Sequence, residues 1–436
     1  MKNILKKIII YLLKFEAKLV LMKYKPKIIA ITGSVGKTST KDAVFTVMSE
    51  FVHIRKSEKS FNSEIGLPLT ILGLPNGWSS PQLWLQNIFK GLWLILWPHK
   101  YPEWLVLEVG VGKRGDMKET ASWLHSDVVI ITTIGITPAH IEFFNSRKEL
   151  IEEKSGLIKT LKKDGLLVLN ADDEAVVSMK PKTKNRTVNY GFSQDADYVA
   201  SSDQILYAEE KDENKKSPMG VTFKVDENGR SLPVVIKGVF GRNHIYASLA
   251  SLAMIGGLKF DMLKAIDSLK DYNAPPGRMR LLSGINNSFI IDDTYNSSPF
   301  ACQTALETLN KVDIEGRKIA ILGDMMELGK HTEEAHYDIG KIAKENCSVL
   351  YVVGPRAQSI KKGALDAGMD EGSILEFTNS YEAADHIKDF INKGDLILIK
   401  GSQIMRMERV TEVVLLDKTH KKDLLVRQDQ EWLSKD

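Results

Sequence analysis

Short apolar runs alternate with stretches of helical periodicity along the first two thirds of the chain. The runs lie at residues 28–31, 104–109, 127–131 and 166–170. Buried strands of a parallel sheet have this nearly continuous apolar character, and their alternation with helices is typical of a sheet that is covered on both faces. The pattern therefore predicts a central α/β domain with a largely parallel sheet.

The same pattern begins again after Pro275-Pro276, which is followed by Gly277. Proline and glycine together mark a break between elements, and we place a domain boundary there. Further strands are expected at residues 288–292, 318–323, 349–354 and 395–400. The region from 276 to 436 is therefore predicted to be a second, Rossmann-like α/β domain. The polar segment 195–229 has turn residues near its end, and it predicts a small antiparallel insert or a sheet edge.

The N-terminal segment, residues 1–26, is predicted to form an amphipathic helix. Its apolar core, residues 8–13, has six residues, whereas a membrane-spanning helix needs roughly 20. No small-residue cleavage site follows, so a signal peptide is poorly supported. Two interpretations stay open: the helix lies on an anionic membrane surface, or it packs on the next domain.

A tryptophan-rich apolar insert at residues 78–104 has the same two interpretations. Tryptophan favours interfaces between apolar and wet surroundings, which suits peripheral membrane contact. A buried helical hairpin explains the segment equally well. We expect the chain to be cytoplasmic, and through these two segments it would contact the inner face of the membrane.

Composition excludes several classes of protein. The chain has 436 residues, of which 43% are hydrophobic and 26% charged, with a formal net charge of +3. These values are typical of a globular protein with more than one domain, and the small charge argues against a nucleic-acid partner. The two cysteines, Cys302 and Cys347, stand apart. A disulfide framework or a structural zinc site is therefore not expected.

A glycine loop follows the first predicted strand and carries the clearest chemical signal. The sequence Thr32-Gly33-Ser34-Val35-Gly36-Lys37-Thr38-Ser39 precedes a predicted helix from Thr38 to about Met48. Such loops bind phosphates through backbone N–H groups, a lysine and an Mg²⁺-binding hydroxyl. Residue 31 is Ile where the usual P-loop has glycine, so this is a shorter form of the loop. The central domain, residues 27–275, is therefore predicted to be a P-loop ATPase-type parallel sheet domain.

Acidic and histidine side chains follow two neighbouring strands of the predicted sheet. Glu108 ends one strand, and His140 and Glu142 follow the next. The carboxyl ends of parallel strands meet at one edge, where the phosphate loop also opens. A carboxylate there completes the coordination of Mg²⁺ that Thr38 begins. A solvated acid and a structural histidine are the alternative interpretations.

Taken together, these motifs resemble the Mur ligases, and most closely the members that add a D-alanyl-D-alanine dipeptide. The resemblance runs in order from about Lys27 to the C-terminus. The motifs that carry it are the phosphate loop, Phe61-Asn62-Ser63-Glu64-Ile65-Gly66, Glu108-x-Gly110, His140-x-Glu142, Asn170-Ala171-Asp172-Asp173, Pro276-Gly277-Arg278-Met279, Asp292-Asp293-Thr294-Tyr295-Asn296-x-x-Pro299, Leu322-Gly323-Asp324-Met325-x-Glu327-Leu328-Gly329 and Lys400-Gly401-Ser402.

The resemblance implies an ATP-dependent carbon–nitrogen ligase of peptidoglycan precursor synthesis. ATP phosphorylates a peptide carboxylate, and the amine of D-Ala-D-Ala attacks the acyl phosphate. Mur ligases place a UDP-sugar-binding domain before the phosphate loop, and here about thirty residues precede Gly33. A partner chain, the membrane or the tryptophan-rich segment is therefore expected to hold the donor peptide precursor.

The resemblance also implies the roles of individual residues. Lys37, Lys154, His140 and Arg278 are the expected catalytic residues. Thr38 and Glu108 are expected to hold one Mg²⁺, and His140 and a carbamylated Lys154 the second. From the residues alone, Lys148, Lys159 and Lys162 remain alternatives to Lys154.

The expected nucleotide-binding residues come from both domains. They are the loop residues Thr32 to Ser39 together with Asn170, His244, Arg278 and Asp293. The chain departs from the family at Gly241-Arg242-Asn243-His244, because the family has Gly-x-His-Asn and uses the asparagine to meet adenine. His331 and His336 lack the spacing of a zinc motif, and we assign them to a solvated helix face.

Two other functions stay open. One is a related ligase that acts on another carboxylate, such as a folate or a polyamide chain. The second is a non-catalytic nucleotide-binding subunit of a membrane-bound wall-synthesis complex. A full set of Lys37, Glu108, His140 and Lys154 argues against a subunit without catalysis.

Overall fold

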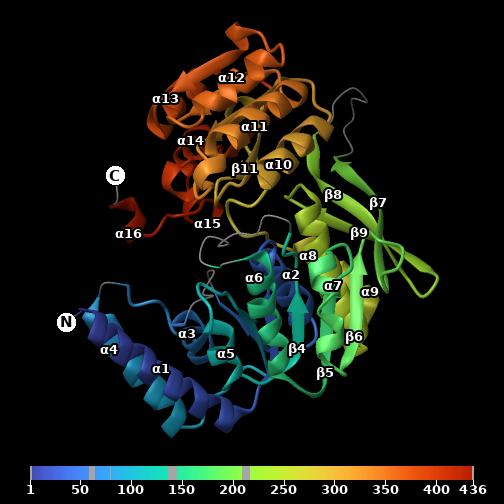
Figure 1. Cartoon of the computed structure of the whole chain (residues 1–436), viewed down its shortest axis with the longest axis vertical. Helices are drawn as coiled ribbons and strands as arrows, with labels where there is room; N and C mark the ends of the chain where they lie inside the picture. Colours follow the sequence, from blue (N-terminus) through green and yellow to red (C-terminus); the bar gives the residue numbers. More distant parts are fainter. Residues whose placement is uncertain are drawn as a thin grey trace. The chain divides into compact units, whose positions relative to one another are not determined.

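The computed structural model describes residues 2–57, 64–78, 80–135, 144, 146–208 and 217–434, with side chains from Lys6 onward. The chain forms two compact units (Figure 1). The first contains residues 1–202, 223–234 and 243–272, and the second contains residues 203–222, 235–242 and 273–436. Each unit is built around its own β-sheet, as the repeated strand pattern predicts.

The first sheet has nine strands in the order β2-β3-β1-β4-β5-β6-β7-β8-β9. Neighbouring strands from β2 to β7 pair in parallel. Strands β1, β3 and β4 are almost wholly buried, which explains their continuous apolar sequences. The bounds are β1 Lys27–Thr32, β2 Ile54–Lys56, β3 Trp104–Glu108, β4 Ser126–Ile131, β5 Leu161–Asn170, β6 Arg186–Gly191, β7 Tyr198–Tyr207, β8 Pro218–Glu227 and β9 Arg230–Lys237.

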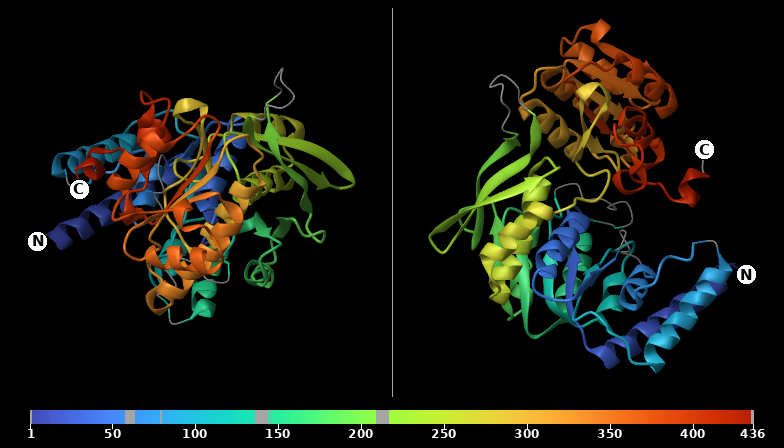
Figure 2. Two further views of the ribbon diagram at one scale, coloured as in Figure 1. Left: turned by 90° about the horizontal axis from the view of Figure 1, so that it is seen from above. Right: turned by 180° about the vertical axis from the view of Figure 1, so that it is seen from behind.

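Helices cover both faces of this sheet. One face packs on a cluster of apolar side chains from α1, α3, α5 and α6. The opposite face is covered by α2, α8 and α9, and Figure 2 shows this side in its right-hand view. The bounds are α1 Lys2–Tyr24, α2 Lys37–Ser49, α3 Gly66–Leu72, α4 Pro81–Leu96, α5 Asp116–Ala121, α6 Arg147–Ser155, α7 Glu174–Val177, α8 Arg242–Leu258 and α9 Met262–Ser268.

The second unit contains a six-stranded sheet in the order β10-β11-β15-β12-β13-β14. Strand β10 pairs antiparallel with β11, and the other neighbours are parallel. Its helices are α10 Pro299–Lys311, α11 Thr332–Asn346, α12 Gln358–Asp366, α13 Ser380–Phe390, α14 Glu408–Val414, α15 Lys421–Leu424 and α16 Gln430–Leu433. The strands are β10 Arg280–Ser283, β11 Phe289–Asp293, β12 Lys318–Gly323, β13 Val349–Val353, β14 Ile374–Phe377 and β15 Leu396–Lys400. The expected Rossmann-like α/β fold is confirmed.

Helix α1 packs on the first unit through a stripe that contains Leu13, Ala17 and Val20, each fully buried. Helix α4, which contains most of the tryptophan-rich segment, lies against α1 (Figure 1). This side of α1 therefore packs on the next domain, as one of the two interpretations of the N-terminal helix predicted. Among the described residues, none of the helices is both long and apolar enough to cross a bilayer.

Candidate active site

The loop between β1 and α2 is shaped by two glycines with positive φ. Gly33 has φ 152°, and a Cβ atom there would lie 1.9 Å from Oγ1 of Thr132. Gly36 has φ 85° and precedes the first turn of α2. A side chain at either position would strain the loop. The N–H groups of the first turn of α2 have no intrahelical partner, and they form an anion-binding end at the loop.

Lys37 folds back over this loop. Its Nζ donates hydrogen bonds to the carbonyl oxygens of Gly33 and Ser34, at 3.0 and 3.3 Å. The hydroxyl oxygens of Thr32 and Ser34 are buried and have no hydrogen-bond partner in the described part of the chain. A cationic group and unsatisfied hydroxyls beside a helix N-terminus fit a bound phosphate.

Glu108 lies at the same edge of the sheet as the phosphate loop. It ends β3 directly opposite Ile31 of β1, and it is 2% exposed. Thr38 in the first turn of α2 is also buried. A hydroxyl and a carboxylate oxygen are ligands that suit Mg²⁺, so the donor chemistry of this pair fits the expected ion.

Lys41, which the sequence analysis did not single out, adds a buried charge beside these residues. Burial lowers the pKa of Lys41, while the carboxylates of Asp42 and Glu108 act in the opposite direction. Its Nζ donates to the carbonyl oxygen of Ser57. Its position close after the predicted phosphate loop could have indicated a role for Lys41. A lysine in a helix is normally exposed, however, so nothing in the sequence predicted a buried one.

Lys154 reaches the phosphate loop from α6. Its side chain is 2% exposed, and its Nζ donates a 2.9 Å hydrogen bond to the carbonyl oxygen of Gly33. Burial, with a smaller contribution from the charge of Lys37, lowers the pKa of Lys154 to about 7. The amine is thus substantially uncharged near neutral pH, which is the form that reacts with CO₂.

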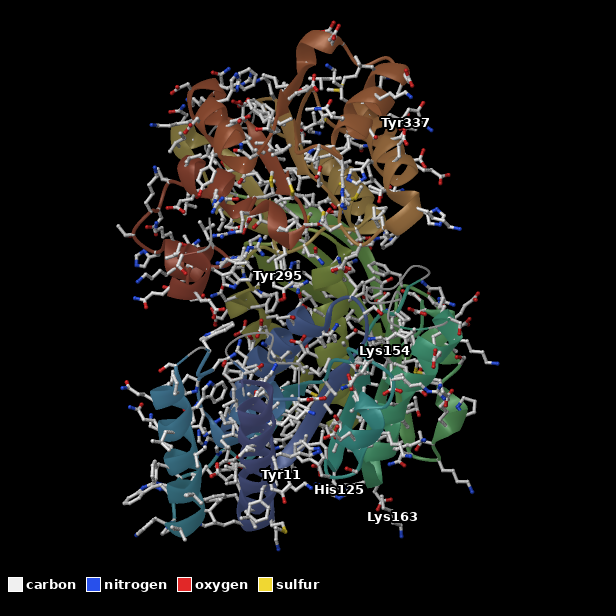
Figure 3. All side chains as sticks on the ribbon, turned by 60° about the vertical axis from the view of Figure 1, so that its left-hand side comes forward. Tyr11, His125, Lys154, Lys163, Tyr295 and Tyr337 are labelled. Carbon is white, nitrogen blue, oxygen red and sulfur yellow. The ribbon has the colours of Figure 1, made fainter. Side chains whose placement is uncertain are left out.

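The alternative lysines are placed differently. Lys148, Lys159 and Lys162 are exposed, and Lys162 pairs with Asp127 at 2.7 Å. Figure 3 shows Lys154 and the exposed Lys163 at opposite ends of the first unit. Of these candidates, Lys154 is the lysine that contacts the phosphate loop.

Asp173 fixes the start of the loop that follows β4. Its carboxylate accepts hydrogen bonds from the N–H groups of Ile134 and Gly135, at 2.7 and 2.9 Å, and it also caps α7. Asn170 donates from Nδ2 to the hydroxyl of Thr133. Asn170 therefore joins the ends of β4 and β5 beside the phosphate loop. The loop leads toward His140, which lies outside the described residues, as do residues 58–63.

His244 is buried near the start of α8. Its Nδ1 lies 3.2 Å from the hydroxyl of Tyr272, which in turn donates to the carbonyl oxygen of Ser39 at 3.4 Å. This chain of contacts connects the expected adenine-binding position to α2. The role of His244 in base recognition stays a prediction.

The second unit brings several of the family motifs to the carboxyl edge of its sheet. Lys400 is 2% exposed, and its Nζ lies 2.5 Å from the carboxylate of Asp293 and 3.0 Å from the carbonyl oxygen of Asn296. The guanidinium carbon of Arg278 lies 4.0 Å from the centre of the Tyr295 ring (Tyr295 is labelled in Figure 3). Arg278 and Asp293 thus belong to one cluster of charged and aromatic groups.

Two buried acids hold this edge together. Asp292 accepts hydrogen bonds from the N–H of Gly277 and the hydroxyl of Thr294, and burial raises its pKa to about 6. Asp324 accepts from the N–H groups of Arg356 and Ala357. Of the two acids in the Asp-Asp motif, Asp293 is therefore nearer to solvent than Asp292.

The assignment of His331 and His336 to one solvated helix face is wrong for His336. His331 is exposed, but His336 is fully buried. Its Nε2 accepts from the N–H of Met325, and its Nδ1 lies 2.7 Å from the carbonyl oxygen of Thr332. Burial lowers the pKa of His336, so this neutral ring shapes the Gly-Asp-Met loop.

A pocket of about 530 Å³ opens beside this edge in the second unit. Its wall includes the N-terminal end of α13, the side chain of Arg406 and the side chain of Arg409, whose guanidinium lies over the ring of Tyr381 at 4.1 Å. Arg406 is paired with Glu408 at 2.6 Å. The residues that line the pocket, among those described, include two arginines and no acid.

Known proteins share both units. Residues 31–255 match the family model of the Mur ligase middle domain, and residues 277–403 match that of the Mur ligase, glutamate ligase domain. The chain belongs to the Mur ligase family. The match confirms the resemblance to the Mur ligases that the short motifs indicated.

Relatives within the Mur ligases cover most of this chain. The UDP-N-acetylmuramoyl-tripeptide–D-alanyl-D-alanine ligase of Bacillus subtilis is 28% identical over 397 residues, which cover 91% of this chain and 77% of the relative. The enzyme of the same name from Rickettsia prowazekii is 28% identical over 415 residues, with 93% and 83% covered. The similarity therefore extends through both units of this Mur ligase.

Solved Mur ligases have the same fold. The MurF ligase of Thermotoga maritima, in complex with ADP, superposes with a TM-score of 0.72 and 26% identity, covering 93% of this chain and 83% of that one. The MurF of Acinetobacter baumannii gives a TM-score of 0.73 at 21% identity, with 92% and 79% covered. The second comparison concerns the fold alone.

Proposed function

We propose that this chain is an ATP-dependent ligase that adds D-alanyl-D-alanine to the peptide carboxylate of a peptidoglycan precursor. The observation that carries the proposal is the contact of Lys154 with the carbonyl oxygen of Gly33, because it brings a readily deprotonated lysine to a phosphate loop. The names of the relatives, and the ADP bound to one solved neighbour, support ATP as the nucleotide and the dipeptide as the acceptor.

The proposed reaction has two steps. The donor carboxylate attacks the γ-phosphorus of ATP, ADP leaves, and an acyl phosphate forms. The amine of the acceptor then attacks the acyl carbon and phosphate leaves as the amide forms. Lys37 and the N-terminal end of α2 hold the phosphates, and their fixed charges stabilise the charge that develops during transfer.

Two Mg²⁺ ions are part of this proposal. Thr38 and Glu108 would hold one, and His140 with a carbamylated Lys154 would hold the other; when bound, the ions neutralise charge on the phosphates. The buried threonine and carboxylate support the first site. The lowered pKa of Lys154 supports the second, since carbamylation needs an uncharged amine. Asn170, His244, Arg278 and Asp293 are proposed on the nucleotide side.

We assign the acceptor carboxylate to the pocket that contains Arg409. A free dipeptide carries a carboxylate at one end, and arginine binds carboxylates in a fixed geometry. The N-terminal end of α13, at Ser380, also lies in the pocket wall and favours an anion. An acceptor held there leaves its amine end for the reaction.

The test is a ligation assay with the full chain, ATP, Mg²⁺, UDP-N-acetylmuramoyl-tripeptide and D-Ala-D-Ala. Phosphate release that depends on the dipeptide, with a product heavier by one dipeptide less water, is the expected result. Lys154→Ala serves as the inactive variant and the exposed Lys159→Ala as its matched control. Phosphate release without a ligated product would contradict the proposal, and no nucleotide turnover with any amine would favour the non-catalytic subunit.

We also propose a cytoplasmic location with peripheral contact at the inner face of the membrane. The support is the amphipathic α1, together with two free cysteines. A partner chain that supplies donor binding stays a prediction. Co-purification of the full chain with a membrane fraction, reversed by high salt, tests the location.

A further inference from the structure

Helix α1 carries a second apolar stripe besides the one that packs on the domain. Ile8, Tyr11, Phe15 and Met22 recur at helical spacing, and their side chains are about half exposed or more. Tyr11, labelled in Figure 3, is 70% exposed. The spacing places these residues on the side of α1 opposite Leu13, Ala17 and Val20. A surface helix of a globular domain normally presents polar residues there.

Helix α4 has the same unusual outer side. Its exposed residues Leu85, Phe89, Leu92, Trp93 and Leu96 recur at helical spacing. Its inner side meets α1 at Gly91, where a Cβ atom would lie 2.1 Å from Oε2 of Glu16. The rings of Trp93 and Trp97 stack at 4.1 Å between their centres. The outer side of α4 is therefore mainly apolar and partly aromatic, with the exposed Gln82, Gln86 and Lys90 beside the stripe.

The two stripes adjoin one another. Lys23 near the end of α1 donates to the carbonyl oxygens of Leu94, Ile95 and Trp97 at the end of α4. Glu16 contacts Gly91, and both residues precede the Lys23 contacts on their own helices by one or two turns. The two helices therefore run side by side in the same direction (Figures 1 and 2). Both outer stripes face away from the core of the unit, and together we call them the α1–α4 face.

The charge around the α1–α4 face is predominantly positive, although Lys14 of α1 pairs with the exposed Glu119 of α5 at 2.6 Å. Residues 1–25 contain seven lysines and a single acid, Glu16, and residues 73–100 contain two lysines and no acid. Glu16 is 3% exposed, so it contributes no negative charge to the surface. Lys6, Lys7 and Lys90 are exposed. Apolar and aromatic side chains with lysines around them match the acyl boundary and the head groups of an anionic lipid layer.

We propose that the α1–α4 face is a docking surface for an anionic lipid bilayer. Leu85, Phe89 and Leu96 enter the acyl boundary, and the lysines contact the lipid phosphates. A second copy of the chain is a poorer occupant because it would bring two lysine-rich surfaces together. The chain lies on the bilayer and does not cross it, in line with the absence of a spanning helix among the described residues.

The test is co-sedimentation of the full chain with vesicles of phosphatidylcholine alone or with 30% phosphatidylglycerol added. Leu96→Glu removes an apolar contact that is 67% exposed, and its matched control is Leu263→Glu on α9, which is 65% exposed. We expect at least tenfold weaker binding of Leu96→Glu to anionic vesicles and unchanged binding of Leu263→Glu. Lys7→Gln and Lys90→Gln should each weaken binding to anionic vesicles about fivefold, which is the contribution of one lysine near an anionic surface. The matched control for both is Lys264→Gln.

Equal binding of the parent chain to both kinds of vesicle, or equal binding of the two leucine variants, would overturn the proposal. A concentration-dependent dimer that Leu96→Glu abolishes, without vesicle binding, would assign the face to a second copy instead. Ligation of soluble substrates without lipid should be the same for the parent and Leu96→Glu. The proposed ligase activity and the docking surface are therefore tested separately.

Discussion

The Nζ atoms of Lys37 and Lys154 share one acceptor, the carbonyl oxygen of Gly33, at 3.0 and 2.9 Å. Burial is the main cause of the lowered pKa of Lys154, and the repulsion between two ammonium groups this close adds to it. A carbamate on Lys154 would convert the repulsion into attraction and would supply a carboxylate to a metal ion. The arrangement thus favours the uncharged amine of Lys154, which is the form that reacts with CO₂.

Replacing Lys37 by alanine should remove ATP turnover and leave the fold intact. The side chain is half-buried at the first residue of α2 rather than part of the core, and it contacts backbone oxygens of the phosphate loop. We expect a loss of at least about a hundredfold, as for other groups that stabilise developing charge. Phosphate release measures turnover and circular dichroism measures the fold, with the exposed Lys148→Ala as control. Turnover within about tenfold of the parent, which corresponds to a rise of only ~1.4 kcal/mol in the activation free energy, would refute the role of Lys37 in phosphate transfer.

Ligation should depend on CO₂ and fall steeply below pH 7. Because the pKa of Lys154 is lowered to about 7, the uncharged amine decreases about tenfold for each pH unit below that value. Less carbamate then forms at limiting CO₂. Activity in CO₂-depleted buffer at pH 6 and pH 8, with and without bicarbonate, measures the effect.

The variant Lys154→Ala provides the matching control for that prediction. It should be inactive at every pH, and acetate or bicarbonate should restore part of the activity by supplying a carboxylate to the metal. Intact mass under CO₂ should show the added carbamate in the parent and not in the variant. An unmodified lysine in an active, Mg²⁺–ATP-bound enzyme would exclude the carbamate.

The free energy of unfolding should fall as the pH rises from about 4.5 to about 7 because of Glu16. Burial raises the pKa of Glu16 from 4.5 to about 7, so the folded state binds more protons than the unfolded state in this range. The full effect is on the order of 3 kcal/mol. Glu16→Met should flatten this dependence and be the more stable chain at pH 8, measured by denaturant unfolding at both pH values. An unchanged pH dependence in Glu16→Met, matching the exposed control Glu50→Met, would contradict the assignment.

The fold followed from the sequence because its signals are local. Strand β3 begins at Trp104, the first residue of the predicted run, and α2 spans Lys37–Ser49 where a helix from Thr38 to about Met48 was expected. The pairing of α1 with α4 was not predictable, since it joins segments about seventy residues apart through the contact of Glu16 with Gly91 and the hydrogen bonds of Lys23. The prediction for His336 was wrong because it rested only on the lack of a zinc-motif spacing. The ring is buried and accepts a hydrogen bond from the N–H of Met325 in the preceding loop.

The candidate site was predictable in part. The motif around Gly33 is continuous in sequence, whereas the choice of Lys154 over its neighbours depended on burial, which the sequence did not show. Asp173 and Lys41 were missed because an acid in a turn and a lysine on a helix are ordinary surface residues. The roles of His244 and Arg278 depend on contacts with a nucleotide, and they stay predictions.

D-Ala-D-Ala should be preferred over L-Ala-L-Ala and over free D-Ala, and Arg409 should contribute to that preference. Arg409 lies in the wall of the pocket over the ring of Tyr381, where a carboxylate would gain a charge-assisted hydrogen bond. Arg409→Met keeps the contact with the ring and removes the charge. We expect KM for the dipeptide to rise at least tenfold with kcat within a fewfold, because the interaction is made equally in the ground state and the transition state. Steady-state phosphate release with each amine measures both constants, and the exposed Lys362→Met serves as control. An unchanged KM would remove Arg409 from the acceptor site, and a preference for free D-Ala would overturn the dipeptide assignment while leaving amide ligation in place.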